Sequence, residues 1–313
     1  MEINHQTFLP NLFILGAAKS GTTTLYNYFK NMPDICMSIP KEPFFFEAYY
    51  EKGLEFYYKH YFKHWNNEPI IGEARHRNLI QPYVPKRIWE TNPNAKLIVI
   101  ARNPVDRAYS HWYHNYVRNT EKLNFKKAIL ADLKRIEKGL DCSTPEEIEK
   151  HCQKLKPFIP QGKAGLGIYR TYIDTGYYYI QIKRYLDLFP KENLKLIIFE
   201  NFVLTPEPII QDIVNFLNID SQRNKFQKNL KINDHHTVKK EPNMTFISKL
   251  YQKNPYAYFF NKITPELIKN KLLGTNPKYE IDTKTKLFLK QHYYQHNKNL
   301  ETLFNINLDI WNT

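Results

Sequence analysis

A lysine stands inside a short glycine-bounded segment, where its ammonium group could neutralise an anion. The segment GAAKSGTTT begins at Gly16 and places Lys19 between that glycine and Gly21. An apolar run (11–16) precedes it, and residues 22–32 follow with apolar side chains at helical spacing. Small residues between a strand and a helix let backbone N–H groups close on phosphate oxygens, and the helix adds its positive end. We therefore expect an anion cradle formed by Lys19, Ser20, Gly21, Thr22 and Thr23.

The glycine spacing is that of a nucleoside triphosphate loop, but the order of the side chains differs. In such a loop the second glycine is followed by Lys and then Ser or Thr. Here Thr22 and Thr23 follow Gly21, and the lysine comes three residues after Gly16. We also find no apolar strand ending in the Mg²⁺-linked Asp of those enzymes. The pattern disfavours a P-loop kinase, which stays as an alternative, and favours transfer of a less highly charged group.

A second motif could bind another phosphate. In LIVIARNPVDRAYSHWYH (97–114), Arg102 follows a buried strand and Ser110 comes about two turns later. The two side chains can converge on one phosphate through charge-assisted and hydroxyl hydrogen bonds. The alternative is an arginine that caps the sheet edge and a serine that faces solvent. Arg107, between them, is also explained as an ion-pair residue on a helix surface.

Together these motifs resemble the sulfotransferases that use 3′-phosphoadenosine 5′-phosphosulfate (PAPS). GAAKSGTTTL is similar to their 5′-phosphosulfate loop, and residues 97–114 are similar to their 3′-phosphate signature. The stretch 289–311 resembles the family's last helix, so the resemblance covers nearly the whole chain except about 120–165. It implies PAPS as co-substrate without a metal, release of 3′,5′-ADP (PAP), and Lys19 at the oxygen that bridges phosphorus and sulfur.

A third segment, SIPKEPFFFE (38–47), resembles the K-E-x-x-F-F segment of Golgi-type glycosaminoglycan sulfotransferases and their bacterial relatives. In that group the glutamate is the general base, so the resemblance implies that Glu42 takes the proton of the acceptor. The alternative is a surface glutamate paired with Lys41. No histidine matches the base motif of cytosolic small-molecule sulfotransferases, and His76 is our second choice for the base.

The acceptor side departs from the family pattern in IGEARHRNL (71–79). Relatives have Gly-Glu followed by small hydroxylated residues and Pro, whereas Arg75 and His76 occur here and indicate an anionic acceptor. We expect a glycan or glycoconjugate, bound by Lys41, Glu73, Arg75 and His76. The basic stretch 235–243 lies where relatives close a loop over the nucleotide, so Lys239 and Lys240 are expected at the 3′-phosphate, with a solvated charge run as the alternative.

Strand and helix patterns alternate along the chain and must position these motifs. Strands are predicted at 11–16, 69–74, 96–102 and 194–200, and helices at 22–32, 84–92, 105–119, 177–190, 207–219 and 283–304. The alternation predicts an α/β fold of the P-loop type, with a parallel sheet between two layers of helices and a helical C-terminal wrap. A charged helical insertion is expected at about 120–165. No repeat or linker divides the chain, so we predict one domain, 1–313.

The composition of the chain is compatible with a sulfotransferase but does not distinguish it from other classes of protein. The 313 residues carry a formal net charge of +14, which favours polyanionic partners. A non-catalytic polyanion-binding protein is therefore the second alternative, although we expect no nucleic acid partner. Cys36, Cys142 and Cys152 are too widely spaced for a zinc site or a disulfide framework, which favours reduced thiols. With no basic and apolar leader and no long apolar span, a cytoplasmic protein is expected.

Overall fold

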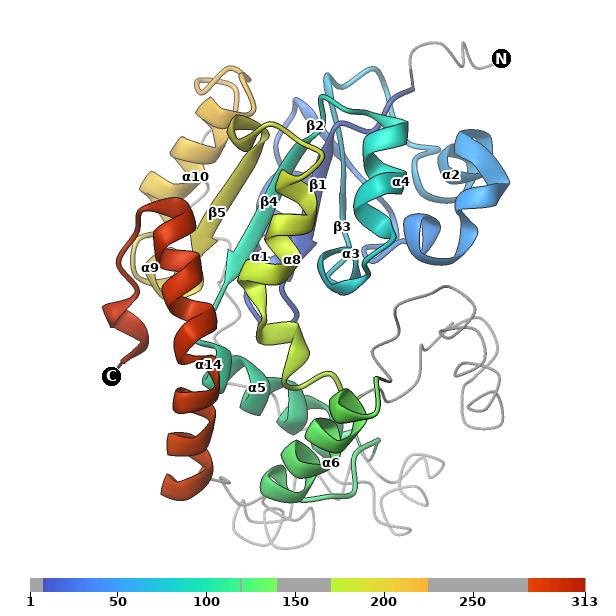
Figure 1. Ribbon diagram of the computed structural model, residues 1–313. Coiled ribbons are helices and arrows are strands. Elements are labelled where there is room, and N and C mark those ends of the chain that lie inside the picture. The colour runs from blue at the N-terminus through green and yellow to red at the C-terminus, as the bar shows by residue number, and fades with distance from the viewer. Residues whose placement is uncertain (1–7, 119, 140–169, 225–280, 313) are drawn as a thin grey trace, which may run out of the picture.

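The computed structural model describes residues 8–118, 120–139, 170–224 and 281–312. Its centre is a single parallel sheet with the strand order β2-β3-β1-β4-β5 (Figure 1). The strands are β1 Leu12–Gly16, β2 Ile35–Met37, β3 Ile70–Ala74, β4 Lys96–Ala101 and β5 Leu194–Ile198. The parallel sheet between helices confirms the predicted α/β fold.

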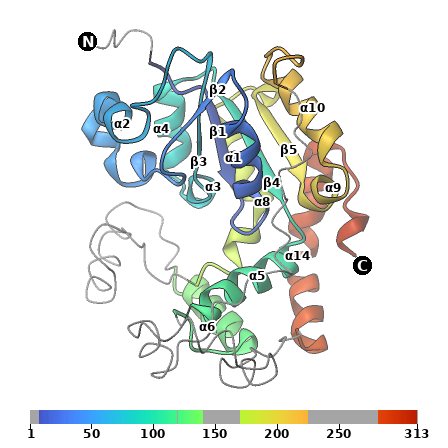
Figure 2. The same cartoon turned by 180° about the vertical axis from the view of Figure 1, so that it is seen from behind.

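Both faces of the sheet are covered, which explains its continuous apolar strands. In β4, Leu97 and Val99 pack with one hydrophobic cluster, and Ile98 and Ile100 pack with another. Helices α4 (Val84–Thr91) and α8 (Tyr178–Leu186) cover the first face, as Figure 1 shows. Helices α1 (Thr22–Lys30) and α10 (Pro206–Phe216) cover the second face, which is turned to the viewer in Figure 2.

The remaining helices surround this sheet. Helix α14 (Thr283–Phe304) packs along α8 as the predicted C-terminal wrap. Helices α5 (Pro104–Val117) and α6 (Phe125–Glu137) form a third cluster beyond the carboxyl edge of the sheet, together with part of α14 (Figure 1). The shorter helices are α2 Gly53–Tyr61, α3 Arg77–Ile80 and α9 Phe199–Leu204, a π-helical turn at Phe45–Tyr49, and 3-10 turns at Tyr50–Lys52, Asp174–Gly176, Lys191–Asn193 and Asp309–Trp311.

Some boundaries differ from the predicted ones. Strand β2 was not predicted, because a three-residue strand is too short for a periodic pattern to show. Strand β5 ends at Ile198, and the next two residues begin α9 instead of continuing the strand to position 200. Of the charged insertion, α6 is described, while residues 140–169, with Cys142 and Cys152, lie outside the described residues.

The strand order places β1 between β3 and β4. The chain leaves β1 toward one side of the sheet, for β2 and β3, and then crosses to β4 on the other side. Ligands of open parallel sheets bind outside the carboxyl ends of the strands at such a switch point. Here those ends face α5 (Figure 2). The residues that follow β1, β3 and β4 are therefore the ones to examine for a site.

Candidate active site

The loop between β1 and α1 turns through two residues with left-handed backbone. Lys19 has a φ of 68° and Gly21 a φ of 84°. A Cβ atom on Gly21 would lie 3.1 Å from the ring of Phe199, so the turn needs glycine at that position. The N–H of Ser20 donates to the carbonyl oxygen of Ala17 at 3.3 Å. The turn thereby wraps tightly around the start of the helix.

The same turn leaves several donors free to bind an anion. Within the described part of the chain, the N–H groups of Gly21, Thr22 and Thr23 donate to no acceptor. Two of these belong to the first turn of α1, where a helix supplies no acceptor of its own. The hydroxyl of Ser20 is buried and also has no partner. Unpaired donors at the positive end of a nine-residue helix fit the 5′-phosphate of a nucleotide.

The ammonium group of Lys19 adds a charge that no neighbour neutralises. Burial, followed by the charges of Arg118 and Arg102, lowers the pKa of Lys19 to about 8. No carboxylate of the described residues offsets these effects. Arg118, at the end of α5, was not singled out from the sequence, because it lies 99 positions from Lys19 and belongs to neither motif. The loop is thus a strongly cationic site.

Arg102 reaches this loop from the end of β4. Its Nη1 donates to the carbonyl oxygen of Lys19 at 3.1 Å, and its guanidinium lies 4.8 Å from the ring centre of Phe199. Tyr178 donates to the carbonyl oxygen of Arg102 at 2.8 Å and so anchors its backbone to α8. Ser110 is half-buried on the next helix, α5. The structure thus brings Arg102 into contact with the loop that carries Lys19. A phosphate site formed by Arg102 and this loop would require that contact.

Two further residues of α5 face inward. Arg107 is fully buried and donates to the carbonyl oxygen of Tyr172, while its Nε and Nη1 have no partner in the part of the chain that the structure describes. A surface ion pair, one reading of this arginine from the sequence, is therefore wrong. Burial, then the charges of Arg107, His76 and Lys19, hold the pKa of His111 well below its usual range. The charges of Lys19 in the loop and of His76 at the end of β3 therefore both disfavour protonation of His111.

The end of β3 continues beside β1 and brings a second group of residues to the loop. The N–H of Arg75 donates to the carbonyl oxygen of Ile14 at 3.1 Å. A Cβ atom on Gly16 would lie 3.2 Å from the carbonyl oxygen of His76, so the two backbones nearly touch. The N–H of Glu42 donates to the carbonyl oxygen of Ala74 at 3.1 Å, which fixes the K-E segment at the same place.

The carboxylate of Glu42 is surrounded by cationic groups. Its Oε2 lies 2.9 Å from Nδ1 of His76, accepts from the N–H of His76 at 3.1 Å, and lies 3.5 Å from Nη1 of Arg75. Its Oε1 pairs with the ammonium of Lys41. Burial opposes its charge, but His76, Lys41 and Arg75 outweigh burial and hold the pKa of Glu42 well below its usual range. The predicted pair with Lys41 exists, within a larger cluster.

Glu47 belongs to this cluster and was missed in the sequence. Its fully buried carboxylate accepts from Nε of Arg75 at 3.0 Å and from Nε of Arg77 at 2.7 Å. Burial opposes its charge, and the two arginines outweigh burial and lower its pKa. Arg75 also stacks 4.1 Å from the ring centre of Phe44. A charged residue within the apolar stretch PFFFEAYY was the available signal. Arg75 is therefore fixed between two carboxylates and a ring.

Glu73 does not face the acceptor side, which corrects its predicted role. Its side chain is 1% exposed and accepts hydrogen bonds from the hydroxyl of Tyr57 and the amide of Asn78. Burial raises the pKa of Glu73 to about 7. Because alternate side chains of a strand point to opposite faces, a polar residue in β3 can be directed into the core, and only its hydrogen bonds make that burial tolerable.

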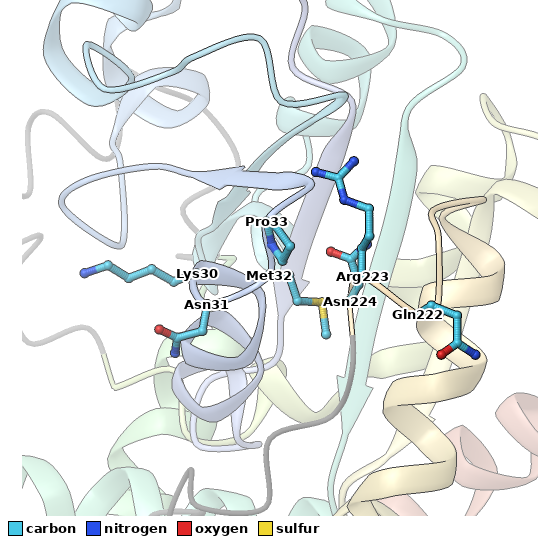
Figure 3. Close-up of a pocket in the computed structure, with 7 residues that line it drawn as sticks. All are labelled: Lys30, Asn31, Met32, Pro33, Gln222, Arg223 and Asn224. Carbon is cyan, nitrogen blue, oxygen red and sulfur yellow. The ribbon is translucent and has the colours of Figure 1, made fainter.

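Other predicted residues and a pocket among the described residues lie elsewhere. Lys239 and Lys240 lie outside the described residues. The pocket in Figure 3 has a volume of about 520 Å³ and is lined by Lys30, Asn31, Met32, Pro33, Gln222, Arg223 and Asn224. It lies past the last turn of α1, at the amino edge of the sheet, and is therefore not the site assembled around Lys19.

In residues 8–118, 120–139, 170–224 and 281–312, no helix has the length and apolar character needed to cross a bilayer. Over the same ranges, no three or more His, Cys, Asp or Glu side chains are grouped so that they could hold a metal ion.

Comparison with known proteins agrees with this geometry. Residues 9–266 match the model of the sulfotransferase domain. The bifunctional heparan sulfate N-deacetylase/N-sulfotransferase 1 of Homo sapiens is 26% identical over 310 residues, covering 94% of this chain and 29% of that protein. The membrane-associated sulfotransferase kil1 of Dictyostelium discoideum is 38% identical over 107 residues, covering 34% and 23%. This chain thus spans less than a third of the length of these relatives.

A solved structure shows the same fold. The sulfotransferase from Alicyclobacillus acidocaldarius superposes with a TM-score of 0.65 at 24% identity, covering 98% of this chain and 100% of the other. The family match extends over most of the chain and includes the loop of Lys19, the end of β3 and the motif of Arg102. The chain therefore belongs to the sulfotransferase domain family, whose sulfuryl donor is PAPS.

Proposed function

We propose that this chain transfers the sulfuryl group of PAPS to a hydroxyl or amino group of a carbohydrate. The observation that carries the proposal is the environment of Lys19. No carboxylate in the described parts of the chain neutralises its ammonium, and it lies in a loop whose donors, unpaired in those parts, would together with Arg102 attract phosphates. A cation held at this point stabilises the negative charge that develops on a departing phosphate.

The donor side follows from the same geometry. Ser20, Gly21, Thr22 and Thr23 would hold the 5′-phosphate, because their donors lack partners among the described residues. Arg102 and Ser110 would bind the 3′-phosphate that distinguishes PAPS from ATP. Lys239 and Lys240, in the basic stretch 235–243, are proposed to add positive charge at that phosphate. The donor would supply an activated sulfur, and the protein would orient it and compensate its charge.

The acceptor side lies at the end of β3. Lys41, Arg75 and Arg77 outnumber the carboxylates of Glu42 and Glu47 at this end. This excess of positive charge, with His76 beside it, supports an anionic glycan or glycoconjugate as acceptor. A relative whose name includes heparan sulfate N-sulfotransferase adds support for a carbohydrate. Glu42 and His76 are the two groups available to take the proton of the acceptor.

Two measurements test this function. PAP should raise the melting temperature of the protein, by the equivalent of about 2.7 kcal/mol at about one hundred times its Kd, while ATP with Mg²⁺ should raise it much less. Labelled sulfate should move from PAPS to at least one member of a panel of unsulfated glycosaminoglycans, glycolipids and small alcohols. Lys86→Met, an exposed lysine on α4, is the control for unspecific charge effects. Preference for ATP, or no transfer to any glycan, would contradict the proposal.

Two broader proposals accompany this function. One domain, 1–313, is proposed to include the charged stretch at about 120–165, and limited proteolysis that releases a stable fragment would speak against it. A cytoplasmic location remains a prediction from the sequence, and the relative kil1 is described as membrane-associated. Fractionation of the host cell tests it.

A further inference from the structure

The imidazole of His76 is held on one side and free on the other. Its Nδ1 lies 2.9 Å from Oε2 of Glu42, and its backbone N–H donates to the same oxygen at 3.1 Å. The side chain is 34% exposed, and its Nε2 has no partner among the described residues. The carboxylate therefore holds the proton on Nδ1, which leaves the lone pair of Nε2 facing outward.

Glu42, by contrast, already has a cationic or hydrogen-bonding partner on each of its two oxygens. Lys41 pairs with Oε1, while Oε2 serves His76 twice and lies 3.5 Å from Arg75. Lys41 and Arg75 stay charged while His76 is neutral, and with the hydrogen bond from His76 they favour the ionised carboxylate, so it is a weak base. Taking a proton would also cost it these ion pairs. Its contacts suit a residue that orients the ring of His76 and stabilises the positive charge of that ring.

The position of His76 relative to the donor loop also fits a base. The carbonyl oxygen of His76 lies against Gly16, three residues before Lys19. The N–H of Arg75, next to His76, donates to the carbonyl oxygen of Ile14 at 3.1 Å, so His76 and Lys19 follow neighbouring parallel strands and border the space beyond the carboxyl ends of β1 and β3. A group that accepts a proton at one end of this space and a cation that receives the leaving oxygen at the other are what an in-line transfer requires.

We propose that Nε2 of His76 is the general base of the sulfuryl transfer and that Glu42 is its positioning residue. This inference rests on the proposed function. As the acceptor oxygen or nitrogen bonds to sulfur, the bond from sulfur to the bridging oxygen breaks, and its electron pair stays on the phosphate beside Lys19. The acceptor proton passes to Nε2 of His76, and Glu42 stabilises the resulting imidazolium through Nδ1–H. Solvent then takes the proton.

The first test reads the ring itself and needs no turnover. Histidine labelled with ¹⁵N should show His76, assigned by its loss in His76→Asn, with the proton on Nδ1 when the ring is neutral. Glu42→Gln should abolish this preference. A ring protonated on Nε2 in the wild type would overturn the proposal.

The second test uses kinetics on an acceptor that the wild type sulfates. His76→Ala should lower kcat by about 10²–10⁴-fold and leave the affinity for PAP unchanged. Added imidazole should restore part of the rate. His76→Asn keeps a donor toward Glu42 without Nε2, so it should stay folded and remain as slow as the alanine variant. His60→Ala, an exposed histidine on α2, is the control and should keep full rate.

The outcomes separate the two residues and the two proposals. If Glu42 is the base, imidazole should not rescue His76→Ala, and His76→Asn should retain most of its rate. Either of these results refutes the assignment to His76. If the wild type transfers no sulfate to any acceptor, the proposed function fails, whereas slow His76 variants of an active wild type with unchanged PAP affinity support the inference.

Discussion

Replacing Lys19 with methionine separates the charge of this side chain from its bulk. The pKa of Lys19 is lowered from 10.5 to about 8, chiefly by burial. Below about pH 8 the folded protein therefore holds a charge that is more stable in the unfolded chain, and this difference corresponds to ~3 kcal/mol. Because the side chain is partly exposed, we expect Lys19→Met to raise the free energy of unfolding by ~1–3 kcal/mol at about pH 7.

The difference in stability between the wild type and Lys19→Met should depend on pH. A lysine whose pKa is lower in the folded state binds fewer protons there, so the wild type should gain stability between about pH 8 and about pH 10.5. The methionine variant has no such gain at this site. Its advantage in urea denaturation should therefore fall to about half or less at about pH 9.5.

Ligand binding should respond in the opposite direction. The charge that destabilises the free protein is the one that a phosphate needs, so Lys19→Met should weaken PAP binding by about 10–100-fold. Lys86→Met should change neither stability nor PAP affinity. A Lys19→Met protein that is less stable than the wild type at about pH 7, or an advantage that does not shrink as the pH rises, would refute the reasoning.

Two further substitutions examine the supports of the site. Arg75→Met leaves the buried Glu47 with Arg77 alone, so we expect urea denaturation to show a loss of ~3 kcal/mol in the free energy of unfolding. The pKa of Glu47 then rises, so acid unfolding should begin at a higher pH than in the wild type. Unchanged acid unfolding would contradict this. Gly21→Ala places a methyl group against the ring of Phe199 on a residue with left-handed backbone. The free energy of unfolding should therefore fall by ~1–3 kcal/mol, and PAP should bind more weakly. Calorimetry that gives the wild-type unfolding temperature and PAP affinity would disprove the need for glycine.

The donor side could be predicted from the sequence because its determinants are local. The turn from β1 to α1 spans only a few residues, so its glycine and lysine can be recognised from their spacing in the sequence. Arg102 follows directly from the buried strand β4. Local patterns do not show short or irregular elements, so β2 and the start of α9 at Phe199 were missed.

The acceptor side could be predicted only in part, because its contacts join distant positions. Glu42 and His76 are 34 residues apart, and the hydrogen bond between them depends on the parallel pairing of β3 with β1 and on the K-E segment that binds the end of β3. Glu47 and Glu73 show the same limit. Both are glutamates near the motif, yet packing places one between two arginines and the other in the core.

The sequence by itself determined the family, the alternation of strands and helices, and the strand-turn-helix unit that carries Lys19. These follow from spacing along the chain, because strand, turn and helix preferences act over a few residues. Only the tertiary structure decided which side chains meet across the carboxyl edge of the sheet and which carboxylates are neutralised. It also showed that, among the described residues, Nε2 of His76 has no partner whereas both oxygens of Glu42 have one. Those properties depend on burial and on charges brought together from separate strands, and no local pattern records them.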